Sequence, residues 1–247
     1  MQTQIDIGDI RVDVTLKAIK NIHLSVYPPY GAVRISAPER MSLDHFLVYA
    51  ISRLAWIRQQ QRKLQRQARE TPREYLDRES HYLWGNRYLL QLTHHQAAPS
   101  IHLAHRRIIL RIRPDTDVEA RRAFMEKSYR QELKAAVPSL IGKWQPLLNV
   151  KVNQFFVQRM KTKWGACATG RGNIRLNSEL AKKNIEYLEY IVVHEMAHLR
   201  VRQHNDRFRD PLDRALPNWR LLKQALDAEP LSHVEWKPLE SKGSPIQ

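Results

Sequence analysis

The chain has 247 residues, of which 43% are hydrophobic and 27% are charged. These proportions are those of a globular protein with a sizeable buried core, and they exclude a low-complexity or disordered chain. The 41 Lys and Arg residues exceed the 25 Asp and Glu residues and give a formal net charge of +16, which favours association with phosphate backbones, nucleotides or acidic proteins.

The N-terminal part of the chain has the pattern of strands followed by a helix. Apolar and polar residues alternate between residues 4 and 37, which is the period of half-buried strands, and residues 28–31 (PPYG) predict a turn between two of them. Ser42 stands where a helix would be capped, and apolar residues follow it at helical spacing. We expect one helix that starts there and runs into the basic stretch 58–73, as a solvated helix end in preference to a nucleic-acid surface.

The middle of the chain returns to alternation and then to a helix. Residues 82–113 predict further strands, with Gly85-Asn86 as a hairpin turn. A long helix is expected from about residue 117 to 136, and Pro138 is expected to interrupt or end it because proline lacks a backbone N–H. Segment 150–177 predicts a strand, a basic turn and another strand.

The C-terminal third has the spacing of helices. Ser178 and Asn184 are both possible helix caps. Residues 185–192 then supply the buried stripe of a helix. Beyond residue 204 the stripe of another helix is bent or restarted at Pro211, and residues 219–228 predict a last helix.

Residues 194–204 read HEMAHLRVRQH and hold three histidines and one glutamate. His194 and His198 are four residues apart, so on a helix their imidazoles lie on one face, one turn from each other. Both can then reach one ion at about 2.1 Å. Glu195 is next to the first of them and can accept a proton from a water that the ion activates.

A catalytic zinc site takes three protein ligands and keeps an open position, and His204 supplies the third imidazole. The turn before it lacks the glycine or asparagine that a left-handed residue favours, so we expect the helix to run to about residues 201–203 before the chain turns back. The dense apolar flanks of the motif favour a buried metal site over a solvated helix. The alternative third ligands are Asp206, Asp210 and Asp213.

A cytoplasmic location is expected from three observations. Cys167 is the single cysteine of the chain, so an intrachain disulfide is excluded and a reducing compartment fits. The first residues lack the basic start and apolar stretch of a signal peptide. No run approaches the roughly 18 apolar residues of a membrane span, so no membrane association is expected. The sequence indicates no oligomeric state.

Several motifs together resemble the YgjP-like metallopeptidase family, which is similar to the minimal zincins and related to the SprT-like and WLM proteases. They are Arg159, the segment Lys163-Trp164-Gly165-Ala166-Cys167, Ile174, Asn177 and HEMAHLRVRQHNDRF. The resemblance extends over roughly residues 15 to 226, with nearly all its specificity in 159–208. It implies zinc ligands at His194, His198 and His204 and a general base at Glu195.

The resemblance also makes Lys163, Trp164 and Asn177 the candidate substrate-binding residues. The sequence departs from the family pattern at three places: Ala166 replaces a usual Ser, Gln203 a usual Asn and Arg209 a usual Trp. None of these removes a ligand. Cys167 would need a nearby base to act as a nucleophile, so a packing role is favoured.

The expected fold class is α+β. Residues 1–114 are expected to form an N-terminal region of antiparallel strands and a helix. Residues 115–228 are expected to form a minimal zincin-like domain, in which a small sheet packs on the helix that carries the HExxH motif. Residues 229–247 are expected to be a flexible tail.

The favoured function is a zinc-dependent peptidase whose polypeptide substrate adds, in extended form, to the edge of the strand at 172–177. One alternative keeps the ion and hydrolyses nucleotide phosphoanhydrides, because the basic surface suits phosphates. The other is a basic, DNA-associated module with a structural metal. Glu195 argues against that module, since a structural site has no need of a carboxylate beside an open position.

Overall fold

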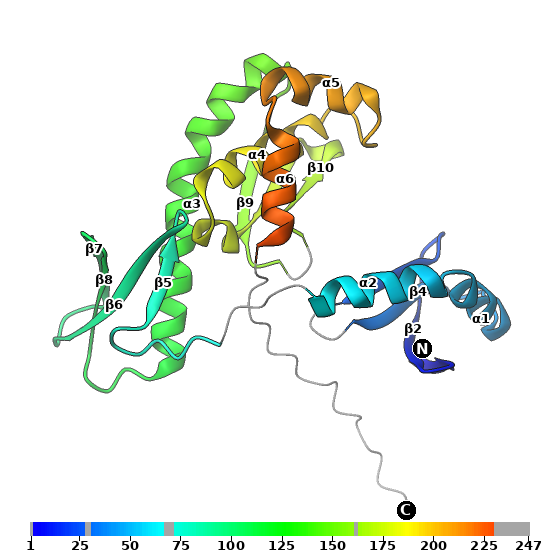
Figure 1. Cartoon of the computed structure of the whole chain (residues 1–247), viewed down its shortest axis with the longest axis horizontal. Helices are drawn as coiled ribbons and strands as arrows, with labels where there is room; N and C mark the ends of the chain where they lie inside the picture. The colour runs from blue at the N-terminus through cyan, green and yellow to red at the C-terminus, as the bar shows by residue number, and fades with distance from the viewer. Residues whose placement is uncertain (1, 28–30, 67–71, 161–162, 230–247) are drawn as a thin grey trace, which may run out of the picture. The chain divides into compact units, whose positions relative to one another are not determined.

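The computed structural model describes residues 2–27, 31–66, 72–160 and 163–229. The chain divides into two compact units, the first within residues 1–70 and the second spanning residues 71–229 (Figure 1). Each unit has its own cluster of buried hydrophobic side chains. The tail expected at residues 229–247 lies, beyond residue 229, outside the described residues. Within the part that is described, no helix has both the length and the apolar character needed to cross a membrane.

The first unit is a four-stranded sheet covered by two helices. Its strands are β1 (Gln2–Ile7), β2 (Ile10–Lys17), β3 (His23–Tyr27) and β4 (Ala32–Pro38), in the order β1-β2-β4-β3. The predicted strands are confirmed, but the sheet is mixed, because β4 inserts beside β2 and runs parallel to it. The other two pairs are antiparallel, as expected. The predicted turn at 28–31 falls mostly outside the described residues.

The single helix expected after Ser42 is wrong: there are two, α1 (Leu43–Ser52) and α2 (Leu54–Arg66). The helical path breaks at Arg53, whose backbone N–H bonds back to the carbonyls of Ala50 and Ile51. The break lets buried side chains of both helices, among them Ala50 and Ile57, join one hydrophobic cluster with the sheet. The periodicity did not predict this break, since the apolar spacing continues across residue 53.

The second unit begins with another four-stranded sheet. Its strands are β5 (Ser80–Leu83), β6 (Asn86–His94), β7 (Ser100–Ala104) and β8 (Arg107–Ile112), in the order β5-β6-β8-β7. The predicted hairpin is confirmed, but its turn lies one residue earlier than expected, at Trp84 and Gly85, which both have positive φ, at 51° and 77°, as a tight turn between two strands requires. Buried residues of this sheet share one core cluster with the helices that follow. The domain boundary expected at residue 115 therefore lies inside this unit.

The long helix α3 (Val118–Leu148) runs along the second unit (Figure 1). Asp117 caps its start by accepting from the N–H of Ala120. The prediction that Pro138 interrupts or ends the helix is wrong, because the helix continues through it. A stripe of seven buried side chains extends along the whole helix. Its burial outweighs the roughly 3 kcal/mol by which an interior proline disfavours a helix.

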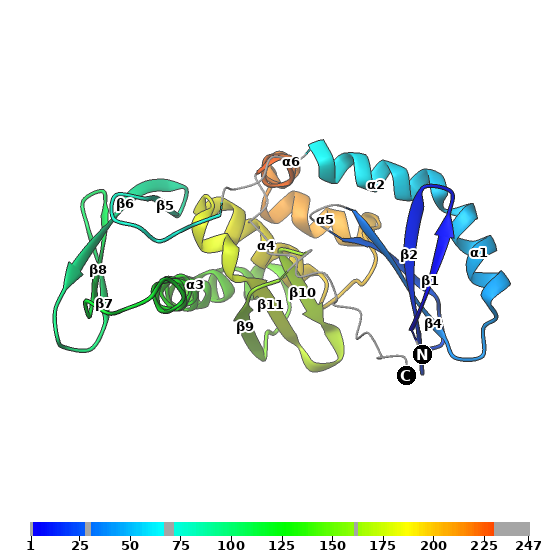
Figure 2. The ribbon, with the colours of Figure 1, turned by 90° about the horizontal axis from the view of Figure 1, so that it is seen from below.

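A three-stranded sheet lies beside α3 and carries one wall of the site (Figure 2). Its strands are β9 (Gln154–Gln158), β10 (Gly165–Ala168) and β11 (Asn173–Asn177). The order is β10-β11-β9, with β10 antiparallel and β9 parallel to the central β11. The strand at 172–177 was expected to present an edge to a substrate. This is wrong, since β11 is paired on both sides and β10 has the open edge.

Short helical elements complete the second unit. The 3-10 turns η1 (Thr169–Arg171) and η2 (Ser178–Lys182) flank β11, and they are followed by α4 (Ile185–Ala197), α5 (Asp206–Ala215) and α6 (Trp219–Ala228). Of the two predicted caps, Asn184 is confirmed and accepts from the N–H of Glu186. Ser178 is not a cap, because Asn177 fills that position for η2. The predicted helix beyond residue 204 is confirmed, but it does not restart at Pro211, because α5 continues through that residue.

Candidate metal centre and active site

Helix α4 positions two of the three predicted ligands. It is buried along much of its length, with Leu188, Val192 and Met196 fully enclosed, so its orientation in the core is fixed. His194 and His198 project from one face, as their spacing predicts, and their ring centroids are 4.8 Å apart. The Nε2 atoms of the two rings are 3.2 Å from each other.

A short turn after α4 brings the third histidine back. The helix was expected to run to about residues 201–203, but it ends at Ala197. None of the residues with positive φ falls between 198 and 204, so the turn needs no left-handed residue. Instead, the Nδ1 atom of His198 bonds to the Val201 carbonyl, 3.0 Å away. A second contact, from the Arg200 guanidinium to the Leu148 carbonyl at 3.2 Å, ties the turn to the end of α3.

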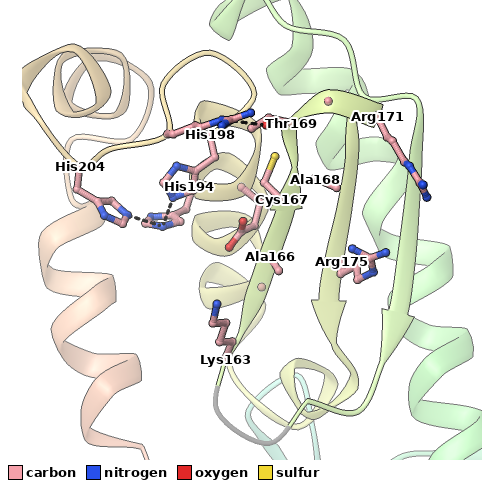
Figure 3. A pocket seen from close by; sticks show the side chains of 14 residues that line it. Lys163, Ala166, Cys167, Ala168, Thr169, Arg171, Arg175, His194, His198 and His204 are labelled. Carbon is pink, nitrogen blue, oxygen red and sulfur yellow. Dashed lines mark hydrogen bonds between the residues drawn. The ribbon is translucent and has the colours of Figure 1, made fainter. Parts of the chain in front are cut away.

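The three imidazoles converge on one point (Figure 3). The Nε2 atom of His204 lies 3.2 Å from that of His194, and the ligand atoms of all three residues lie within 4.8 Å of one another. Two nitrogen ligands at about 2.1 Å from a tetrahedral ion are separated by about 3.4 Å, so the spacing fits a single ion. The donation from His198 Nδ1 leaves its Nε2 lone pair free for a metal.

The electrostatics of the rings also suit a metal. Burial lowers the pKa of His194 to about 3, with further lowering by His198 and His204. Burial also lowers the pKa of His198, although its bond to the Val201 carbonyl opposes this. Both rings are therefore neutral at pH 7, which is the form of imidazole that coordinates metal ions.

The alternative third ligands do not join this cluster. Among the described residues, the group able to hold a metal consists of the three histidines. Asp213 instead accepts from the Trp219 indole N–H and pairs with Arg220, and Asp206 is an exposed partner of Arg209. The structure thus favours His204 over the aspartates.

The Phe208 ring packs against the rings of all three histidines. It is 1% exposed, and its ring centroid lies 5.1, 4.6 and 4.7 Å from those of His194, His198 and His204. It is held in this position by α5, whose N-cap Asn205 directly follows the third histidine and accepts from the Phe208 N–H. Sequence reasoning placed Phe208 in a helical stripe but missed this role.

Glu195 is enclosed between α4 and β10. The residue is only 6% exposed, and burial raises the pKa of its carboxyl to about 7, while nearby Lys163 opposes the rise. Gly165 of β10 lies against it: a Cβ atom there would be 2.6 Å from Glu195 Oε1 and 2.7 Å from its Cγ. Because only glycine leaves this space, β10 forms a close-fitting wall for the carboxylate.

The family described as YgjP-like, metallopeptidase domain, matches residues 20–229 of the chain. The chain belongs to this YgjP-like metallopeptidase family. Among solved structures, it is similar to the metallopeptidase zymogen abylysin of Pyrococcus abyssi, with 19% identity, a TM-score of 0.35 and coverage of 36% of this chain and 90% of that chain. The zymogen jannalysin of Methanocaldococcus jannaschii is similar at 20% identity and a TM-score of 0.33, covering 36% of this chain and 92% of that chain. The search of curated proteins found no match.

The open edge of β10 in this YgjP-like chain borders the cavity that contains the three histidines. The Asn177 N–H donates to the Trp164 carbonyl at the start of the β10–β11 pair. Because bonded and non-bonded pairs alternate in antiparallel strands, Ala166 and Ala168 turn their backbone groups toward β11. The backbone groups of Gly165 and Cys167 therefore point to the open edge.

A cavity of about 820 Å³ surrounds this edge and includes the three histidines and Glu195. Four cationic side chains line it, namely Lys163, Arg171, Arg175 and Arg202, and Glu195 is the one carboxylate among its lining residues. The site of this YgjP-like chain is thus a basic cleft with a single buried acid.

The three predicted substrate-binding residues lie in different surroundings. Lys163 lines the cavity. Trp164 packs against the hydrophobic cluster of the second unit and is not among the lining residues. Asn177 is buried, and its side-chain amide donates to the carbonyls of Met160 and Lys163. Asn177 therefore holds the segment before β10 and reaches no substrate directly.

Cys167 lines the cavity as a thiol and not as a thiolate. Burial and the neighbouring Glu195 raise its pKa to about 11, so it is protonated at pH 7. A protonated thiol is a poor nucleophile, which agrees with the packing role favoured from the sequence.

Proposed function

We propose that this YgjP-like chain is a zinc-dependent peptidase in which His194, His198 and His204 hold the ion and Glu195 is the general base. The observation that carries the proposal is the convergence of three imidazoles beside one buried carboxylate. A purely structural metal site has four protein ligands, whereas the described residues supply three at this place. The arrangement leaves a position open for chemistry.

Zinc is favoured because the donor set is three imidazole nitrogens, which suits this ion in a tetrahedral geometry. When bound, zinc supplies a Lewis acid that polarises a carbonyl and acidifies water. Phe208 and the short turn after α4 keep the three rings in place, so little reorganisation accompanies binding of the ion.

Glu195 performs the proton transfers. Its carboxylate removes a proton from the attacking water as the water oxygen bonds to the scissile carbonyl carbon. The same carboxyl group then delivers that proton to the amide nitrogen as the C–N bond breaks, so the base is regenerated. A pKa near 7 matches both steps at neutral pH.

The peptide would lie along β10. An extended chain can bond to the outward backbone groups of Gly165 and Cys167 and so add a strand to the sheet. This route places the peptide beside Glu195, because Gly165 is the residue in contact with that carboxylate. Lys163 would help to bind the peptide at the same end of the strand.

The test compares wild type with Glu195→Gln and with Glu186→Gln, an exposed carboxylate in the first turn of the same helix. Zinc-loaded wild type and Glu186→Gln should cleave an unfolded polypeptide, and Glu195→Gln should bind zinc but lose at least about 100-fold in kcat. Equal activity of all three proteins would refute the role of Glu195.

The cations of the cleft also suit phosphates, so nucleoside triphosphates belong in the same assay. Release of pyrophosphate by wild type, but not by Glu195→Gln, without cleavage of any peptide would replace the peptidase by a phosphoanhydride hydrolase. A DNA-associated module with a structural metal would show turnover on neither substrate and DNA binding that weakens steeply with salt.

A further inference from the structure

We propose that the cleft selects acidic polypeptide segments, and that Arg175 determines this specificity by binding a carboxylate side chain of the substrate. This inference rests on the proposed peptidase function, because it assumes a peptide strand on the edge of β10. It goes further in naming the substrate class and the residue that recognises it.

The first observation is the charge of the cavity. Lys163, Arg171, Arg175 and Arg202 all line it, and the only carboxylate among the lining residues is the enclosed Glu195. Among the described residues, Arg171, Arg175 and Arg202 form no ion pair with a carboxylate, and Arg202 instead donates to the Thr169 hydroxyl. These guanidinium groups can therefore bind a substrate carboxylate without first breaking an ion pair within the protein.

The second observation is the register of the sheet. Arg175 of β11 stands directly opposite Ala166 of β10, so both side chains lie on the same face of the sheet. This is the face away from the core, because their neighbours Ile174 and Leu176 are fully buried on the other side. Ala166 is small, so the longer Arg175 side chain can extend across it toward the open edge, and both residues line the cavity.

The lengths of the two side chains allow Arg175 to meet a glutamate of the substrate. A peptide strand added to β10 lies two strand spacings, or about 10 Å, from β11. A substrate glutamate opposite Ala166 would point to the same face as Arg175, and the two long side chains approaching from both ends can span that distance. Residues on either side of this glutamate would instead face the inner wall, where Glu195 lies.

In the structure, Arg175 leans away from the open edge, over an aromatic residue of the neighbouring strand β9 (Figure 3). Its guanidinium carbon lies 5.8 Å from the centroid of Phe156, a residue of β9 that is 40% exposed. A cation–π contact at an exposed ring contributes only about 0.5–1 kcal/mol, so a substrate carboxylate can draw the guanidinium from Phe156 across Ala166 to the open edge. Ala166 adds no polar group that would compete for that carboxylate.

The experiment uses zinc-loaded full-length protein and sets of peptides that differ at one position by Glu, Gln or Lys. Wild type should cleave the best Glu peptide roughly three- to tenfold more efficiently than its Gln counterpart, with the difference in KM and not in kcat. Arg175→Gln should remove the preference, and Arg175→Glu should reverse it in favour of Lys. Lys134→Gln, an exposed cation on α3 with the same change in charge, should leave it intact.

A binding measurement separates recognition from catalysis. In the Glu195→Gln background, the uncleaved Glu peptide should bind more tightly than the Gln peptide, and addition of Arg175→Gln should abolish the difference. Cleavage without any acidic preference, or a preference that survives Arg175→Gln, would overturn this inference and leave the peptidase intact. Failure of wild type to cleave or bind any peptide would overturn both. Melting temperatures confirm that each variant is folded.

Discussion

Replacement of Gly165 by alanine tests the placement of Glu195 without touching a ligand or the base itself. The new Cβ atom would lie 2.6 Å from Glu195 Oε1, whereas ordinary contact begins at 3.4 Å. The carboxylate must therefore move by about 0.8 Å, and a misplacement of about 1 Å costs on the order of 100-fold in rate. We expect kcat to fall by about that factor, equivalent to roughly 2.7 kcal/mol of transition-state stabilisation.

The same change should leave the fold and the metal in place. Gly165 does not have a positive φ, so alanine causes no backbone strain there, and the atoms that must move belong to one side chain. We therefore expect an unchanged zinc stoichiometry and a melting temperature close to that of wild type. The control is Gly142→Ala in α3, where an added Cβ meets nothing within 4 Å and activity should be retained.

The assay is the rate of peptide cleavage at saturating substrate, with zinc measured by mass spectrometry on the same samples. Full activity of Gly165→Ala would show that the contact between β10 and Glu195 has no part in catalysis. Loss of zinc from this variant would show instead that the substitution acts on the ligands, which the reasoning excludes.

Three further predictions concern the ligands, their support and a buried histidine. Substitution of His204 by alanine should abolish stoichiometric zinc binding, whereas alanine at the exposed His102 should retain it; zinc retained without His204 would move the third ligand elsewhere. Phe208→Leu should lower zinc affinity roughly tenfold because the rings lose their common support, and an affinity equal to that of wild type, in a competition assay with a chelator, would contradict this. Burial lowers the pKa of His81 to about 4 from 6.5. Between these two pH values the unfolded chain binds a proton that the folded chain does not bind. The free energy of unfolding should therefore fall as pH drops from about 6.5 to 4, by at most about 1.4 kcal/mol per pH unit. His81→Gln should flatten this dependence in urea unfolding, and an unchanged slope would argue against it.

The convergence of the three histidines was predictable from the sequence because their spacing is local. Two histidines four residues apart must share a helix face, and a third histidine six residues later can return once the helix ends. The sequence did not predict how the chain turns back after α4 to bring His204 to the other two histidines. The helix stops at Ala197 because His198 bonds to the Val201 carbonyl and Arg200 bonds to Leu148, and the second of these contacts joins residues far apart in the sequence.

The wrong predictions about the fold also result from contacts between residues far apart in the sequence. Pro138 has a strong local preference to end a helix, yet the buried stripe of α3 outweighs it. Alternation predicted strands corresponding to β9 and β11 but missed β10 between them in the sequence, and it could not predict the pairing, which is set by tertiary contacts. The edge was therefore assigned to β11 when it belongs to β10. No sequence pattern predicted the contact of Gly165 with Glu195, because the fold brings these two segments together.

The central claim is that three imidazoles and no other side chain hold a catalytic zinc ion. X-ray absorption at the zinc edge of the purified, zinc-loaded protein measures this coordination directly. We expect three imidazole nitrogen neighbours at about 2.0–2.1 Å and one oxygen neighbour. A sulfur neighbour at about 2.3 Å, which would implicate Cys167, or a sphere of oxygens alone would contradict it.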